Sequence, residues 1–220
     1  MITIYGVYRS RALRNIWLLE EAGQPFRHVP VLQDFRVSPG QAQGAGAIHS
    51  RSAEFLAINP QGGIPAMQDG DLVLSESLAI NLYLARKFGA PLGPKDAAED
   101  GLMLQWAFFG ATEIEPRSIQ ILYNRVQLPP DQRSEAKVEE AIAALRRPLA
   151  TLDAALAATG FLIGGRFTVA DINMAEVIRY TLPAPEALDG APRVKAWLTA
   201  CHARPAWKKV IARREEEPAL

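Results

Sequence analysis

The stretch from residue 59 to residue 77 constrains the fold of this chain more than any other part of the sequence. Ile64-Pro65 begins an apolar run, Asp69-Gly70 interrupts it, and Leu72-Val73-Leu74 resumes it, which is the pattern of two short strands joined by a tight turn. Pro65 has no N–H to donate to a strand ladder, so we place it at the start of the first strand. Ser75-Glu76-Ser77 then precedes a new apolar run and favours a helix start. We therefore predict a hairpin that leads directly into a helix.

The segment before this hairpin has the pattern of a strand, a helix and a second strand. The predicted elements of this half are a strand at residues 2–6, a helix at 11–22, a strand at 26–32, a long loop at 33–52, a short helix at 53–58 and a helix at 77–88. The loop is assigned because it is rich in Gly and Gln, which neither a helix nor a strand favours. These elements form a mixed α/β unit.

The rest of the chain is helical in pattern, and Ala90-Pro91-Leu92-Gly93-Pro94 separates it from the hairpin region as a stiff link. The predicted helices cover residues 97–125, 134–158, a stretch that opens at Thr168, 191–202 and 205–217. Pro116 and Pro148 lie inside the first two and predict kinks or lost helical hydrogen bonds. Asp171, three residues after Thr168, is expected to act structurally in a capping box.

Two motifs together resemble the cytosolic glutathione transferases. The first is Asn59-Pro60-Gln61 followed by Ile64-Pro65, the hairpin and Ser75-Glu76-Ser77, and the second is Phe-Thr-Val-Ala-Asp at residues 167–171. The resemblance, which is to bacterial and serine-type members, implies the glutathione transferase fold. It places a thioredoxin-like α/β glutathione-binding domain at residues 1–89, a linker at 90–96 and an all-α helical bundle at 97–220.

The resemblance also implies a binding mode for glutathione, the co-substrate of the family. In that family the proline of the motif is cis, so the backbone of Ile64 before Pro65 is expected to receive the cysteinyl part of glutathione like an added strand. Glu76 and Ser77 are expected to receive the γ-glutamyl end at a helix N-terminus.

Ser10 and Arg11 are the two candidates for contact with the glutathione sulfur. Ser10 follows the first strand and opens a helix, so capping of that helix is one role for its hydroxyl. In serine-type members a serine four residues before an arginine hydrogen-bonds the sulfur, and Ser10 with Arg14 fits that spacing. Arg11 at the same helix start is the alternative. Lowering a thiol pKa from about 8.5 to about 6.5 needs roughly 2.7 kcal/mol, which a charged hydrogen bond and a helix N-terminus can supply.

This sequence departs from the family pattern at two positions near the expected glutathione site. Gly62 stands where serine-type members often carry a histidine, and Leu78 stands where some classes have an arginine. His49 and Arg51 are candidates to reach the glycyl carboxylate instead. Alternatively, His49 and Arg51 are solvent-exposed loop residues without a binding role.

The acceptor pocket is expected between the domains, where the family binds its second substrate. Its aromatic candidates are Tyr8, Trp106, Phe109 and Tyr123. The three on the long helix fit a helical core equally well, so they do not identify the acceptor.

Composition and charge exclude several other classes. Lys plus Arg and Asp plus Glu both number 24, so no basic field favours a nucleic-acid partner. No apolar run reaches the roughly 18 residues of a membrane span, and the N-terminus enters a strand pattern at once, so we expect a cytoplasmic protein without a membrane partner. A single cysteine, Cys201, leaves no Cys-x-x-Cys pair or cysteine metal cluster, and no metal is expected.

The resemblance implies a homodimeric glutathione transferase of the detoxification type that directs a thiolate at a small electrophilic substrate. One alternative is a non-catalytic glutathione- or ligand-binding scaffold of the same fold. The other is a glutathione-dependent isomerase or dehalogenase.

Overall fold

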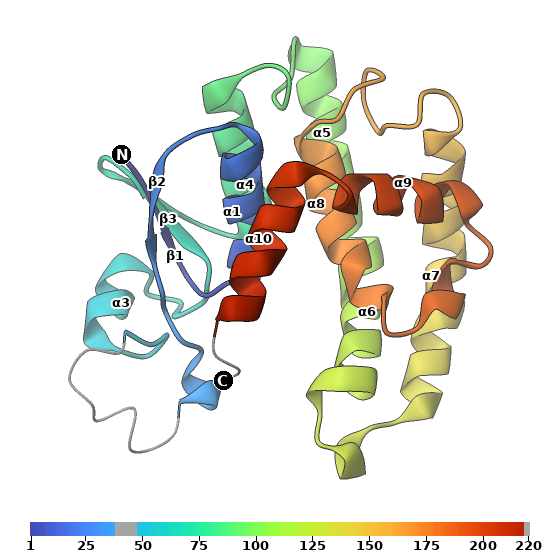
Figure 1. Cartoon of the computed structure of the whole chain (residues 1–220), viewed down its shortest axis with the longest axis horizontal. Coiled ribbons are helices and arrows are strands. Elements are labelled where there is room, and N and C mark those ends of the chain that lie inside the picture. Colours follow the sequence, from blue (N-terminus) through green and yellow to red (C-terminus); the bar gives the residue numbers. More distant parts are fainter. Residues whose placement is uncertain (38–47, 218–220) are drawn as a thin grey trace. The chain divides into compact units, whose positions relative to one another are not determined.

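The computed structural model describes residues 1–37 and 48–217, and it divides into two compact units (Figure 1). The first unit comprises Met1–Lys87 and Pro205–Leu220, and the second comprises Phe88–Arg204. Residues 38–47, which fall in the predicted long loop, lie outside the described residues. The division differs from the predicted one chiefly in the C-terminal helix, which was expected in the helical domain and lies in the first unit.

A four-stranded mixed sheet forms the centre of the first unit. Its strands are β1 (Ile2–Tyr5), β2 (Phe26–Val29), β3 (Ala66–Asp69) and β4 (Leu72–Ser75), in the spatial order β2-β1-β3-β4. β1 runs parallel to β2, as a strand–helix–strand connection requires, and antiparallel to β3. The β3–β4 hairpin pairs Met67 with Leu74 and turns at Gly70, which has a positive φ of 62°. The predicted hairpin is thus confirmed.

Helices cover both faces of this sheet. They are α1 (Ala12–Glu21), the short α3 (Ala53–Ile58) and α4 (Ser77–Phe88), with a 3-10 turn at Asp34–Arg36. Figure 1 shows α1 and α4 on one side of the sheet and α3 on the other. Phe55 of α3 is fully buried and clusters with Val31 and Ala66, so α3 is held by the same sheet that carries the hairpin.

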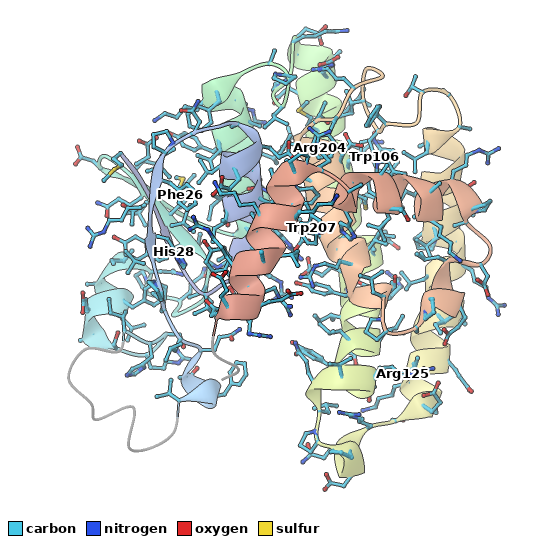
Figure 2. The ribbon with its side chains drawn as sticks, in the orientation of Figure 1. Phe26, His28, Trp106, Arg125, Arg204 and Trp207 are labelled. Carbon is cyan, nitrogen blue, oxygen red and sulfur yellow. The ribbon has the colours of Figure 1, made fainter. Side chains whose placement is uncertain are left out.

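The C-terminal helix α10 (Pro205–Glu216) packs on α1, and this explains its place in the first unit. The Trp17 and Trp207 rings lie 4.7 Å apart between the two helices, and both are buried. Figure 2 labels Trp207 on α10. Lys209 forms an ion pair with Glu20 at the edge of this contact. Burial of two tryptophan rings contributes more than any short-range helical preference.

The second unit is helical throughout. Its α-helices are α5 (Ala97–Phe109), α6 (Glu115–Leu122), α7 (Glu135–Leu156), α8 (Val169–Ile178) and α9 (Pro192–His202), with π-helical turns at Gly110–Ile114 and Tyr123–Gln127 and 3-10 turns at Pro130–Gln132, Arg179–Thr181 and Pro185–Leu188. Every residue of α8 is buried, so this helix is the centre of the unit.

The two helical prolines act differently. The predicted long helix around Pro116 is divided, because a π-helical turn ends at Ile114 and Pro116 occupies the first turn of α6, where a missing N–H costs little. Pro148 lies inside α7, which continues through it to Leu156. With no N–H to donate, Pro148 removes one helical hydrogen bond, as predicted, without ending the helix.

The predicted capping box at the start of α8 is confirmed. The Thr168 hydroxyl accepts the Ala170 N–H at 3.3 Å, and Asp171 Oδ2 accepts the Thr168 N–H at 2.9 Å. Asp171 Oδ1 additionally accepts the Leu162 N–H at 3.2 Å and the Trp197 indole N–H at 3.0 Å. Burial raises the pKa of the Asp171 carboxyl, and these hydrogen bonds oppose that change. Its role is structural.

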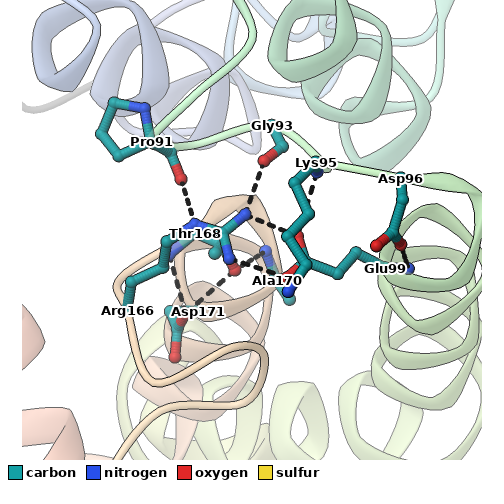
Figure 3. A network of polar contacts seen from close by, with 9 residues as sticks. All are labelled: Pro91, Gly93, Lys95, Asp96, Glu99, Arg166, Thr168, Ala170 and Asp171. Atoms are coloured by element: carbon teal, nitrogen blue, oxygen red, sulfur yellow. Dashed lines mark hydrogen bonds and ion pairs between the residues drawn. The ribbon is translucent and has the colours of Figure 1, made fainter.

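Arg166 connects the link at residues 90–96 to α5 (Figure 3). Its guanidinium donates to Glu99 Oε1 at 2.9 Å and Oε2 at 2.6 Å, and also to the carbonyls of Pro91 at 3.1 Å and Gly93 at 2.9 Å. The Ala90-Pro91 bond in this link is cis, a feature that no sequence pattern indicated. The Arg166 guanidinium is the main cause that lowers the pKa of Glu99 to about 2. One bidentate pair thus fastens the link to the helical unit.

Throughout residues 1–37 and 48–217, none of the helices combines the length and the hydropathy that crossing a membrane requires.

Candidate functional site

The turn after β1 carries the first group of predicted site residues. Gly6 ends the strand: its N–H donates to the Val29 carbonyl at 3.0 Å, and its own carbonyl accepts from His28 Nε2 at 2.6 Å. The φ angle of Gly6 is 140°, a conformation that favours glycine. Two neighbouring residues of β2 therefore fix the point at which the chain leaves the sheet.

Gly6 also brings the turn and the hairpin motif together. A Cβ placed on Gly6 would lie 3.5 Å from Ile64 Cβ and 3.6 Å from Ser10 Oγ. The same Cβ would lie only 2.8 Å from Ala12 Cβ, a contact that a real side chain cannot make. The Ser10 hydroxyl and Ile64 therefore both border the space at Gly6, close to the start of α1.

Ser10 uses its hydroxyl within the turn. Its Oγ–H donates to the Val7 carbonyl at 2.7 Å, and its Oγ accepts the Ala12 N–H at 3.1 Å. The Ser10 hydroxyl thus caps the helix start as the sequence predicts, although the N-cap position of α1 is Arg11 and not Ser10. The Arg11 side chain is exposed at the same helix start. The choice between these two residues as partners of the sulfur stays a prediction.

The motif before β3 forms a compact loop that ends in a cis peptide bond. Asn59 is buried, and its Nδ2 donates to the Gly63 carbonyl at 2.7 Å while its Oδ1 accepts the Gln61 N–H at 3.3 Å. The Ile64-Pro65 bond is cis, as the family resemblance implied. The strand ladder begins at the next residue, Ala66, so the backbone of Ile64 lies at the end of the paired region.

Glu76 and Ser77 lie at the start of α4. Glu76 is exposed and has a φ of 68°, the only positive value of a non-glycine residue within the described part of the chain. Such a conformation in a residue of this size costs roughly 1–3 kcal/mol and is typical of functional sites. Ser77 is buried, and its hydroxyl accepts from Arg14 Nη1 at 3.1 Å.

Arg14 entered the sequence prediction only through its spacing from Ser10, and its structural role was not predicted. Arg14 is buried on α1, and its contact with Ser77 links the helix that Ser10 opens to the helix that Ser77 opens. Asn15 reinforces this link by donating to the Ser77 carbonyl at 2.8 Å and to Asn81 Oδ1 at 2.7 Å. A buried polar pattern in an otherwise apolar helix, Arg14-Asn15, was the available signal.

Gly62, His49 and Arg51 lie at one edge of the loop. A Cβ on Gly62 would lie 2.7 Å from the Ser50 carbonyl oxygen and 3.2 Å from Arg51 Nη1, so no side chain fits where serine-type members often carry a histidine. Arg51 forms an ion pair with Asp34 at 3.7 Å, and His49 Nδ1 accepts the Arg51 N–H at 3.3 Å. Whether His49 and Arg51 also bind glutathione stays a prediction.

The four residues predicted for the acceptor pocket fall in both units. Tyr8, in the first unit, stacks edge-on against His28 with ring centres 4.9 Å apart, and it lines a cavity of about 680 Å³ with His28, Pro30, Lys209, Ala212, Arg213, Glu216 and Glu217. In the second unit Trp106 is buried and contacts Phe109 edge-on at 5.6 Å, and Tyr123 is partly exposed. The shared pocket stays a prediction.

Among residues 1–37 and 48–217, no group of three or more His, Cys, Asp and Glu side chains is arranged to hold a metal ion. The Ser10 hydroxyl is bonded to the backbone, to the Val7 carbonyl and the Ala12 N–H. A hydroxyl at a helix start can donate to an anion and stabilise a thiolate.

The sheet order, the cis-proline beside β3 and the helix that begins at Ser77 define the first unit as a thioredoxin-like domain, followed by a helical domain. The N-terminal domain of glutathione S-transferases matches residues 9–87, and the C-terminal domain of glutathione S-transferases matches residues 102–205. The chain belongs to the glutathione S-transferase family of enzymes.

Individual relatives cover nearly the whole chain. Glutathione S-transferase 3 of Zea mays is 34% identical over 96% of this chain and 93% of its own length. Glutathione S-transferase GstB of Escherichia coli is 29% identical over 96% of this chain and 98% of its own. The crystal structure of the theta class enzyme from Xanthomonas axonopodis pv. citri, with glutathione bound, has a TM-score of 0.80 and 31% identity and covers 94% of this chain and 95% of its own.

Proposed function

We propose that this protein binds reduced glutathione along the Ile64-Pro65 edge and activates its thiol beside Ser10. The cysteinyl backbone pairs with Ile64, the γ-glutamyl end meets Glu76 and Ser77, and His49 and Arg51 serve the glycyl carboxylate. The thiolate sulfur then forms a bond to an electrophilic carbon of a small acceptor, and the leaving group departs with its bonding electron pair.

One observation carries this proposal: Ile64 and the Ser10 hydroxyl both border the space at Gly6. Ile64 lies where an added strand would begin, and Ser10 offers a hydroxyl at the opening of α1. A tripeptide that pairs with Ile64 would have its central side chain directed toward that hydroxyl. We therefore expect the sulfur to lie beside Ser10 when the cysteinyl backbone pairs with Ile64.

The Ser10 hydroxyl must change its hydrogen bond to act on the sulfur. In the free protein its proton is donated to the Val7 carbonyl at 2.7 Å. Binding a thiolate replaces this neutral hydrogen bond with a charged one, so the net gain is the difference between about 1.5–3 and about 0.5–1.5 kcal/mol. This difference corresponds to about one pKa unit of the bound thiol.

The experiment is an ultraviolet titration of enzyme-bound glutathione, which follows thiolate absorbance against pH. We expect Ser10→Ala to raise the pKa of the bound thiol by about one unit, and Arg11→Ala to leave it unchanged. A shift with Arg11→Ala alone would move the role to Arg11. Calorimetry with glutathione tests the binding step separately, where Glu76→Ala is expected to weaken affinity.

A conjugation assay with an aromatic halide and glutathione tests the transfer step. Release of halide together with loss of free thiol is the expected result for a transferase. Binding of glutathione with no turnover of any electrophile would instead indicate a scaffold of the same fold. The proposal includes a homodimer, which sedimentation velocity would show as a species of twice the chain mass.

A further inference from the structure

Glu217, immediately after α10, makes four hydrogen bonds to the turn that carries Ser10. Its Oε1 accepts the Tyr8 N–H and its Oε2 accepts the Arg9 N–H, both at 2.9 Å. Its main-chain carbonyl accepts from Arg9 Nε and Nη2, both at 3.3 Å. The Glu217 carboxylate therefore binds two successive backbone amides, and the Glu217 main-chain carbonyl binds the Arg9 side chain beside them.

These contacts complete the fixation of the turn. The Gly6 N–H and carbonyl are bound by β2, and the Val7 carbonyl is bound by the Ser10 hydroxyl. The amides of Tyr8 and Arg9 lie between these anchored points, where neither strand nor helix supplies an acceptor, and Glu217 provides both. Hydrogen bonds from amides to a carboxylate are roughly twice as strong as neutral ones, so this anchor outweighs an ordinary turn contact.

We propose that Glu217 is a positioning residue of the glutathione site: its carboxylate fixes the Tyr8–Arg9 backbone and thereby holds the Ser10 hydroxyl within hydrogen-bonding reach of the thiolate. This inference rests on the proposed role of Ser10. It assigns the end of the chain a part in the reaction without any contact to the reacting atoms. No local pattern in the sequence marks Glu217 for this role, because Tyr8 lies 209 positions before it.

The direction of the shift in the pKa of the bound thiol distinguishes a positioning role of Glu217 from a purely electrostatic effect of its charge. A carboxylate near the site disfavours a second negative charge, so its removal alone would lower the pKa of the bound thiol. Loss of positioning would raise that pKa, because Ser10 would no longer meet the sulfur. The two explanations thus predict shifts in opposite directions for the same substitution.

The experiment compares Glu217→Ala and Glu217→Gln with the parent chain, and Glu215→Ala serves as the matched control. Glu215 is exposed near the same end of α10 and carries the same charge. We expect Glu217→Ala to raise the pKa of bound glutathione by about one unit, which lowers the conjugation rate near pH 6.5 by about fivefold. The side chain of Glu217→Gln keeps one oxygen that can accept a backbone N–H, so this variant should raise the thiol pKa less. Glu215→Ala should not raise the thiol pKa.

The pH profile distinguishes positioning from damage to the fold. Above about pH 9 free glutathione ionises unaided, so the rate of Glu217→Ala should return to that of the parent. A loss of rate that persists at high pH would contradict the inference. So would a pKa that stays unchanged or falls in Glu217→Ala.

A double variant shows whether Glu217 acts through Ser10. If it does, Ser10→Ala with Glu217→Ala should raise the thiol pKa no further than Ser10→Ala alone. Additive shifts would overturn the inference. If Ser10→Ala itself causes no shift, the proposed function of Ser10 fails, and the inference fails with it. If Ser10→Ala shifts the pKa and Glu217→Ala does not, only the role of Glu217 is refuted.

Discussion

Replacement of Glu99 by Gln should remove a pH-dependent part of the stability of the helical unit. Glu99 is buried, and its carboxylate accepts two hydrogen bonds from Arg166 and one from the Lys95 N–H at 3.0 Å (Figure 3). Glutamine has the same shape but offers one acceptor and no charge. The substitution therefore tests the bidentate pair while leaving the packing of α5 intact.

The magnitude follows from the pKa of Glu99, which is lowered from about 4.5 to about 2, chiefly by Arg166 and also by Lys95, against the opposing effect of burial. At about 1.4 kcal/mol per unit, this difference corresponds to about 3.5 kcal/mol. The Arg166 side chain is 26% exposed, so screening by solvent reduces the expected contribution to about 2 kcal/mol. Because the folded pKa is depressed, the contribution is fully present above about pH 4.5 and is lost as the pH falls toward 2.

Urea unfolding followed by tryptophan fluorescence measures this contribution. At pH 7 we expect Glu99→Gln to lower the free energy of unfolding by about 2 kcal/mol, and at pH 3 by about half as much. Glu140→Gln, at an exposed position of α7, is the control and should change stability by less than about 0.5 kcal/mol. Equal losses at both pH values would refute the reasoning, since the pair would then contribute without ionisation of Glu99.

Two further substitutions test the loop before β3 and the capping box of α8. Gly62→Ala should destabilise the first unit by about 1–3 kcal/mol in urea, because φ is 66° and the new Cβ would meet the Ser50 carbonyl oxygen at 2.7 Å. Gly63→Ala, whose nearest atom is 4.0 Å away, is its control, and equal effects would contradict the argument. Asp171→Asn should lower the free energy of unfolding of the helical unit by about 1–3 kcal/mol, because the carboxylate loses its hydrogen bonds to the Thr168 N–H and the Trp197 indole N–H. The same change at the exposed Asp189 should leave the free energy of unfolding unchanged.

Local rules predicted the elements of this fold well because each is signalled by adjacent residues. The hairpin follows from the interruption at Asp69-Gly70, and Gly70 adopts the positive φ that a tight turn needs. The start of α8 follows from Thr168 and Asp171, whose side chains form the box that their spacing predicts. The cis bond before Pro65 came from family resemblance alone, since most X-Pro bonds are trans.

The same rules did not predict the π-helical turns or the position of α10. The turn at Gly110–Ile114 separates α5 from α6 just before Pro116, and a helical periodicity of 3.6 cannot indicate the extra residue it contains. The amphipathic pattern of α10 shows that it buries one face but not against which partner. The sequence allowed Trp207 to pack on either unit, and its contact with Trp17 shows that α10 belongs to the first unit.

The candidate site is the part of the molecule where local rules end, and Ser10 shows why. Its position at a helix start predicts a capping hydroxyl, and the bond from the Ala12 N–H confirms that role. The direction of the same hydroxyl depends on the turn before it, which is fixed by His28 from β2 and by Glu217 from the end of α10. Chemistry at such a residue is therefore set by partners far away in sequence, and a substitution at Glu217 should alter it while every local signal around Ser10 stays unchanged.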